Sequence, residues 1–242
     1  MPRIDRLSRV AILPVAPVVW RQGRELRKVT PILPEAEQPW TGAVAGPDPL
    51  RLLVLGDSTA AGVGVTRQED GLPGNLARAL HAYTGRGVDW VSRGRSGATA
   101  RDVITEGHLP AEPADILFLS IGANDALGLR TTSAFVKDVR VILDHVRSLN
   151  PRTTLLMSSL PMFHRFALLP EPLRGRLRRH SLALEGAARL LVADYDDAHM
   201  SIDPPPYTDG FFATDEFHPS ASGYRDWATF AIDDAASAGM FR

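Results

Sequence analysis

Arg51-Leu52-Leu53-Val54-Leu55-Gly56-Asp57-Ser58 is the stretch of sequence that decides the fold. Its first five residues carry a short apolar run, which is typical of a β-strand buried on both faces of a parallel sheet. Glycine, aspartate and serine follow directly, and these residue types favour turns and helix starts. The stretch therefore predicts a buried strand after which Ser58 opens a helix.

Outward from this strand, apolar runs alternate with helical patterns. The clearest helix is expected at 132–149, where apolar residues recur along one helix face. Asn150-Pro151 ends it, because proline disfavours helix in the preceding residue. The other expected elements are strands at 51–55, 88–92, 116–121, 154–157 and 191–195, and helices at 73–83, 99–106, 173–190 and 221–238. This alternation predicts an α/β fold, a three-layer α/β/α sandwich around a five-stranded parallel sheet.

Residues 1–49 differ in composition from the rest of the chain. Five prolines and two glycines lie between positions 31 and 49, a composition typical of an irregular linker. We therefore expect residues 1–49 to be an N-terminal extension and residues 50–242 to form a single α/β domain, whose size lies in the usual range.

Composition excludes several classes of function. The 242-residue chain has no cysteine, so thiol nucleophiles, thiolate metal sites and disulfides are excluded. Its net charge of −1 provides no basic field that would attract nucleic acid. A nucleotide-binding domain is also disfavoured, since the chain lacks both a G-x-x-x-x-G-K-[ST] run and a complete dinucleotide fingerprint.

The apolar run at residues 10–20 bears on localisation. It is too short to span a bilayer, which takes about 20 residues. Pro14 and Pro17 interrupt it, and no small-residue cleavage site follows. These features favour a cytoplasmic protein over a secreted or membrane-associated one. A weak membrane-surface contact through residues 10–20 is the alternative.

Four short motifs follow the ends of expected strands: Gly56-Asp57-Ser58, Ser96-Gly97, Gly122-Ala123-Asn124-Asp125 and Asp215-Glu216-Phe217-His218-Pro219. In open parallel sheets the site lies outside the carboxyl ends of the strands. The first three motifs follow the first three strands, and the fourth follows the last strand. We therefore expect their side chains to meet at one edge of the sheet.

The first and last motifs supply the parts of a nucleophilic site. The Ser58 hydroxyl needs a base to become a nucleophile, and a neutral His218 ring is able to accept its proton. Asp215, three residues before the histidine, is placed to orient the ring and stabilise its charged form. A plain helix-capping serine is the structural alternative for Ser58. His199, after Asp196-Asp197, is a weaker rival base that we expect in a solvated loop.

The middle motifs supply donors for a developing oxyanion. The candidates are the Ser58 and Gly97 backbone N–H groups and the Asn124 side-chain amide. Glycine permits backbone angles that turn an N–H inward, and Gly94 competes with Gly97 for this role. The structural alternative for Asn124 is an Asx turn at a strand exit.

Together, the four motifs resemble those of the SGNH (GDSL-type) hydrolases, a family of serine esterases, lipases, thioesterases and carbohydrate deacetylases. The resemblance covers residues 51–238 and implies Ser58, Gly97, Asn124 and His218 as the name-giving residues, with Asp215 completing a triad. It also implies a flavodoxin-like sandwich and no metal or organic cofactor. Ser92 is a departure, because many members have asparagine at the start of the glycine motif.

Substrate signals are weaker. Met162, Phe163 and Phe166 lie in an apolar segment after a strand end. This segment is equally consistent with a lid or acyl-contacting loop and with an ordinary packed element. We expect a serine esterase acting on a small-molecule acyl ester, with a carbohydrate O-deacetylase acting on an acetylated glycan as the alternative. A non-catalytic binding protein on the same fold is the second alternative, which the complete triad disfavours.

Overall fold

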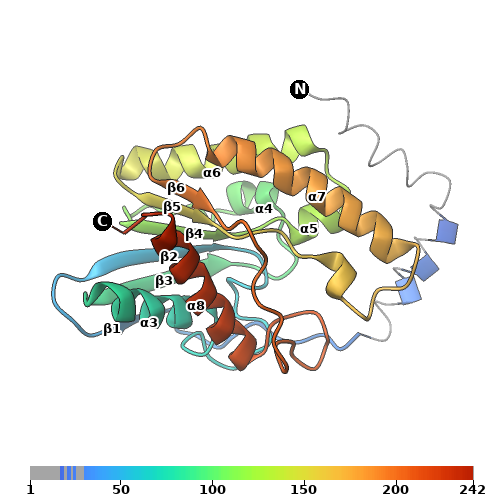
Figure 1. Ribbon diagram of the computed structural model, residues 1–242, viewed down its shortest axis with the longest axis horizontal. Coiled ribbons are helices and arrows are strands. Elements are labelled where there is room, and N and C mark those ends of the chain that lie inside the picture. Colours follow the sequence, from blue (N-terminus) through green and yellow to red (C-terminus); the bar gives the residue numbers. More distant parts are fainter. Residues whose placement is uncertain (1–16, 19–20, 23, 26–29, 242) are drawn as a thin grey trace.

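The structure is a computed structural model that describes residues 17–18, 21–22, 24–25 and 30–241 (Figure 1). The expected membrane-surface segment, residues 10–20, lies outside the described residues except for 17–18. Among the helices of these described ranges, none has both the length and the apolar character needed to cross a membrane.

A central sheet of six strands runs in the order β1-β3-β2-β4-β5-β6. Five strands are parallel: β2 (Leu50–Gly56), β3 (Val88–Gly94), β4 (Ile116–Ser120), β5 (Thr154–Met157) and β6 (Ala198–Met200). Their order is that of flavodoxin-like folds, in which the strand order reverses beside the first strand. The reversal lies between β2 and β4, and this is where such sheets place their sites.

Two sequence predictions about the sheet were wrong. The sheet has six strands instead of five, because β1 (Thr41–Val44) pairs antiparallel with β3 at the edge. The strand expected at 191–195 is instead the end of a helix and a turn, and the last strand is the shorter β6.

Helices cover both faces of the sheet (Figure 1). Helices α3 (Leu72–Thr84) and α8 (Ala221–Ser237) cover one face. The other face carries α4 (Ala100–Thr105), α5 (Ala123–Leu127), α6 (Thr132–Leu149) and α7 (Leu173–Val192). Side chains alternate along β2. Leu53 and Leu55 therefore pack in the core on the side of α4 to α7, while Leu52 and Val54 pack in the core on the side of α3 and α8. This confirms the α/β sandwich.

Close packing of strand ends brings the loops of the site together. A Cβ atom at Gly56 would lie 1.9 Å from the Ser120 carbonyl oxygen, so glycine is required where β2 meets β4. The chain then turns without forming the helix that the sequence predicts at Ser58. The Ala61 N–H donates to the Asp57 carbonyl and the Val63 N–H to the Ser58 carbonyl, a compact turn that holds Ser58 at the end of β2.

Candidate active site

Ser58, His218 and Asp215 form a hydrogen-bonded chain at the carboxyl edge of the sheet. The Ser58 Oγ lies 2.9 Å from the His218 Nε2, and the His218 Nδ1 lies 2.6 Å from the Asp215 Oδ2. Ser58 and His218 are 160 residues apart in sequence. This geometry allows the ring to accept the serine proton while the carboxylate fixes the tautomer.

The loop that carries the carboxylate holds itself in place. The second oxygen of Asp215, Oδ1, accepts the backbone N–H groups of Phe217 and His218, each at 3.0 Å. Burial raises the pKa of Asp215, but the hydrogen bonds from the His218 ring and from the two N–H groups outweigh burial and leave this pKa below its usual value. The carboxyl is therefore ionised and available to orient the imidazole.

Asn124 contacts the loop that joins β3 to α4, and this loop contains Gly97. Asn124 stands in the first turn of α5, a short helix absent from the sequence prediction, and its Nδ2 donates to the Ala98 carbonyl at 3.0 Å. Gly97 has φ +81°, which favours glycine, and a Cβ there would meet nothing within 4 Å. Within the described part of the chain, neither the Gly97 nor the Ser58 N–H has a hydrogen-bond partner.

Gly94, the competitor for Gly97, is a packing residue at the end of β3. A Cβ atom there would lie 2.8 Å from the Ala60 Cβ and 2.9 Å from the Asp57 carbonyl oxygen. Ser92, two residues earlier, is buried and donates to the Ala60 carbonyl at 2.6 Å. Both residues therefore fix the loop after the serine, and Gly97 is the glycine that faces open space.

Asp125 anchors the same loop through charge. Its Oδ2 accepts the Ala100 N–H at 3.0 Å, and its Oδ1 lies 3.1 Å from the Arg130 Nε. Arg130 also pairs with Asp138 of α6. Burial raises the pKa of Asp125 to about 6, although the Ala100 N–H and the Arg130 charge oppose this rise. The part played by Arg130 had no sequence signal, because it lies outside every motif.

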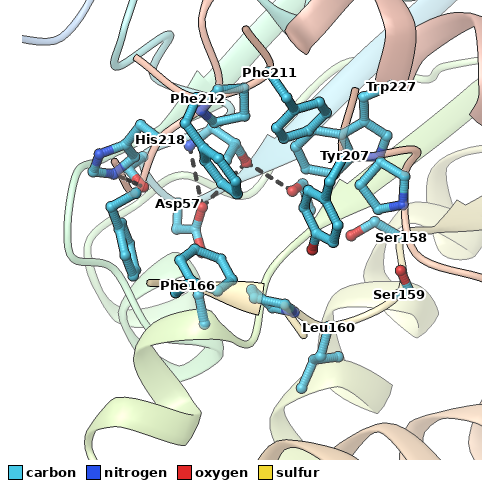
Figure 2. Close-up of a pocket in the computed structure, with 18 of the residues that line it drawn as sticks. Asp57, Ser158, Ser159, Leu160, Phe166, Tyr207, Phe211, Phe212, His218 and Trp227 are labelled. Atoms are coloured by element: carbon cyan, nitrogen blue, oxygen red, sulfur yellow. Dashed lines mark hydrogen bonds between the residues drawn. The ribbon is translucent and has the colours of Figure 1, made fainter. Parts of the chain in front are cut away.

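An aromatic pocket of about 70 Å³ opens beside the serine. We call it the aromatic pocket; besides Ser58 and His218 its walls include Ile121, Leu160, Phe166, Tyr207, Phe211, Phe212, Phe217 and Trp227. Figure 2 shows the rings of Phe166, Tyr207, Phe211, Phe212 and Trp227 around a common space, with Asp57 and His218 to one side of it. The space is largely apolar and lies next to the Ser58 side chain.

The three expected substrate residues have different positions. Phe166 lines the aromatic pocket, with its ring centroid 5.3 Å from that of Phe212. Phe163 is fully buried in the core behind it and does not line the pocket. Met162 is also absent from the lining, and its N–H points toward the Tyr207 hydroxyl at 3.5 Å.

Most of the aromatic residues that line the aromatic pocket were not predicted from the sequence. Tyr207, Phe211 and Phe212 lie in the loop before Asp215, and Trp227 comes from α8. The one available signal was the aromatic pair Phe211-Phe212, close to the Asp-x-x-His motif.

The position of His199 differs from the sequence expectation. His199, the expected rival base, lies in β6 and not in a solvated loop, and its Nε2 is 2.7 Å from the Asp234 Oδ2. In the described residues as a whole, no group of three or more His, Asp or Glu side chains is arranged to bind a metal ion.

The chain is similar in sequence to a known protein family and to a known esterase. A model of the GDSL-like lipase/acylhydrolase family matches residues 54–225. A GDSL-like esterase of Mycobacterium tuberculosis is 27% identical over 203 residues, which cover 78% of this chain and 63% of that protein. The chain therefore spans less than two thirds of the length of this relative.

Solved structures share the fold. A lipase from a goat rumen metagenome superposes with a TM-score of 0.60 at 17% identity, over 80% of this chain and 99% of that one. An acetylxylan esterase from Geobacillus stearothermophilus gives a TM-score of 0.56 at 18% identity, over 78% of this chain and 95% of that one. At such low identity these similarities concern the architecture alone.

Proposed function

The chain belongs to the GDSL-like lipase/acylhydrolase family, and we propose that it is an ester-hydrolysing enzyme that cleaves short-chain carboxylic esters through an acyl-enzyme at Ser58. The observation that supports this most directly is the hydrogen-bonded chain from Ser58 through His218 to Asp215. A serine hydroxyl gains nucleophilic strength when a base within hydrogen-bond reach takes its proton.

In the proposed mechanism, the Ser58 Oγ attacks the ester carbonyl carbon while the His218 Nε2 takes the hydroxyl proton. The carbonyl oxygen gains the negative charge and accepts hydrogen bonds from the Ser58 N–H, the Gly97 N–H and the Asn124 amide. His218 then gives its proton to the departing alkoxide, which leaves as the alcohol. Water then attacks the acyl carbon while the His218 Nε2 takes its proton, and His218 returns this proton to the Ser58 Oγ as the bond to the acyl group breaks and the carboxylic acid leaves.

The size of the aromatic pocket supports a short acyl group. Its volume of about 70 Å³ exceeds by only a few fold the ~10–15 Å³ that one water molecule needs on the same kind of measure. Acetyl to butyryl groups fit such a space, while a long acyl chain would have to displace the aromatic rings. The same observation favours the second candidate, a carbohydrate O-deacetylase, since acetyl is the smallest of these acyl groups.

A panel of p-nitrophenyl esters from acetate to dodecanoate, together with acetylated xylo-oligosaccharides, tests the proposal. We expect kcat/KM to be highest for two to four acyl carbons and to fall steeply by octanoate. Ser58→Ala should remove turnover of every ester. Release of acetate from the oligosaccharides at a higher kcat/KM than from any aryl ester would favour the deacetylase. No turnover by the folded native protein would favour a non-catalytic binding protein.

A further inference from the structure

A second hollow, of about 550 Å³, adjoins the aromatic pocket. We call it the outer hollow, and its lining residues are Leu33, Pro34, Glu35, Glu37, Gly64, Val65, Thr66, Phe212, Ala213, Thr214 and Ser220. Phe212 lines both spaces, so its ring is a shared wall. The outer hollow is several times larger than the aromatic pocket, and no step described above uses it.

One wall of the outer hollow comes from a segment that precedes the family match. The buried Ala36 donates its N–H to the Ala61 carbonyl at 2.9 Å, and the Glu37 N–H donates to the Thr66 carbonyl at 2.8 Å. The Glu35 Oε1 accepts the Ser96 N–H at 2.7 Å. These bonds fix residues 35–37 against the loops that follow β2 and β3, so the wall is a built part of the fold.

The opposite wall of the outer hollow belongs to the loop of the proposed base. Thr214 directly precedes Asp215, and the Ala213 N–H donates to the His218 carbonyl at 2.8 Å. On the other side, Glu35 holds Ser96, the neighbour of Gly97. The outer hollow therefore lies between the loop that presents the oxyanion donors and the loop that carries His218.

Reaction chemistry places the alcohol half of the ester on this side. The leaving oxygen must come within hydrogen-bond reach of the His218 Nε2 to receive its proton. The group attached to that oxygen then extends past the His218 loop, and the outer hollow offers room for a group larger than a short acyl chain.

The charged residues that line the outer hollow are acidic. Glu35 and Glu37 are exposed carboxylates, and none of the residues that line the outer hollow is a lysine, arginine or histidine. Resting on the esterase function proposed above, we propose that the outer hollow is the subsite for the alcohol half of the substrate and that it disfavours negatively charged alcohols relative to positively charged ones.

A steric variant tests the location of the subsite. Thr66 is exposed and lines the outer hollow, while its bond to Glu37 uses only the backbone carbonyl. Thr66→Trp should lower kcat/KM for choline acetate by about tenfold or more and leave methyl acetate within about twofold. Thr66→Ser is the matched control and should change neither. Equal effects of Thr66→Trp on both esters would overturn the assignment.

A charge variant tests whether the outer hollow disfavours negatively charged alcohols. Three acetates serve as probes: choline acetate, its uncharged isostere 3,3-dimethylbutyl acetate, and the anionic 2-sulfoethyl acetate. Glu37→Gln should raise kcat/KM for the anionic ester relative to the cationic one by up to about 25-fold, because one exposed unit charge about 4 Å away in water changes each ester about fivefold, in opposite directions. Each ester is compared with itself in the two proteins, so differences in leaving ability cancel.

Glu112→Gln is the matched control for charge, because Glu112 is exposed and lies outside the outer hollow. It should leave the ratio of the two charged esters unchanged. A ratio that moves equally in both variants, or in neither, would overturn the proposed charge selection. Loss of all turnover in the native protein would instead overturn the esterase function itself, so the two failures are distinguishable.

Discussion

Asn124 has two amide hydrogens, and the fold uses one of them to hold the Ala98 carbonyl. The second is available for an oxyanion. We expect Asn124→Ala to lower kcat by roughly 10²–10³ with little change in KM, because the lost bond forms fully only in the transition state. Steady-state kinetics with p-nitrophenyl acetate measures both constants.

Asn150→Ala is the matched control for this prediction. The Asn150 Nδ2 donates to the Ala114 carbonyl at 2.9 Å, just before β4 begins, so it makes the same kind of bond at the opposite edge of the sheet. It should leave kcat unchanged. An Asn124→Ala effect confined to KM would argue against oxyanion stabilisation.

Asp57 makes the folded state sensitive to pH. Burial raises the pKa of Asp57 to about 6, although hydrogen bonds from Thr59 and the charge of His218 oppose this rise. The folded protein therefore holds a proton that the unfolded chain loses near pH 3.8, and the contribution of Asp57 to the free energy of unfolding falls as pH rises from about 4 through 6.

Asp57→Asn removes this titration while keeping an oxygen that accepts the Thr59 bonds. The free energy of unfolding of the variant, minus that of the native protein, should increase between pH 4 and pH 7 by up to about 3 kcal/mol. Urea denaturation at several pH values measures this difference. A difference that stays constant over the range would show that Asp57 titrates as an ordinary carboxyl.

At the scale of elements, Arg130 joins α5, α6 and the loop of Gly97. Its removal leaves the buried carboxyl group of Asp125 without its cation and leaves buried Asp138 with Arg101 alone. We expect Arg130→Met to lower the free energy of unfolding by about 3 kcal/mol, as measured by chemical denaturation. Arg140→Met, which removes an exposed pair with Asp194, should cost less than about 1 kcal/mol. Equal costs would contradict the role of burial.

Elements with a strong periodic signal were predictable, and the short elements β1, α5 and β6 were not. The expected helix 132–149 and strand 154–157 agree with α6 and β5. The run at 191–195 resembled a strand because Leu191 and Val192 are buried where α7 ends, and a short apolar run has the same appearance in either element. The true strand β6 has one buried residue in three, and β1 lies among prolines and glycines.

The site was more predictable than the pocket around it. Ser58, Gly97 and Asn124 follow strands that the sequence marks clearly, and the sheet brings strand ends together. The aromatic lining of the aromatic pocket depends on how the long loop from β6 to α8 folds back over the serine. Nothing local to Tyr207 or Phe212 specifies that path, so tertiary packing alone assigns them to the pocket.

For the whole molecule, the structure leads us to propose that the working domain includes part of the expected extension. Residues 35–37 and β1 pack on the loops and edge strand of the α/β domain. Deleting residues 1–29 should leave Tm within a few degrees. Deleting residues 1–45 should lower Tm by at least about 5 °C, while the folded fraction still hydrolyses methyl acetate. Equal Tm values for the two deletions would place the boundary at residue 50 instead.

Labelling with an alkyl fluorophosphonate, followed by intact mass and peptide mapping, tests the nucleophile directly. Such a reagent bonds only to a serine that a neighbouring base has activated. The native protein should gain one adduct, located on Ser58, and Ser58→Ala should gain none. An adduct that persists in Ser58→Ala, or that maps to another residue of the native protein, would contradict the hydroxyl–imidazole–carboxylate chain as the centre of the chemistry.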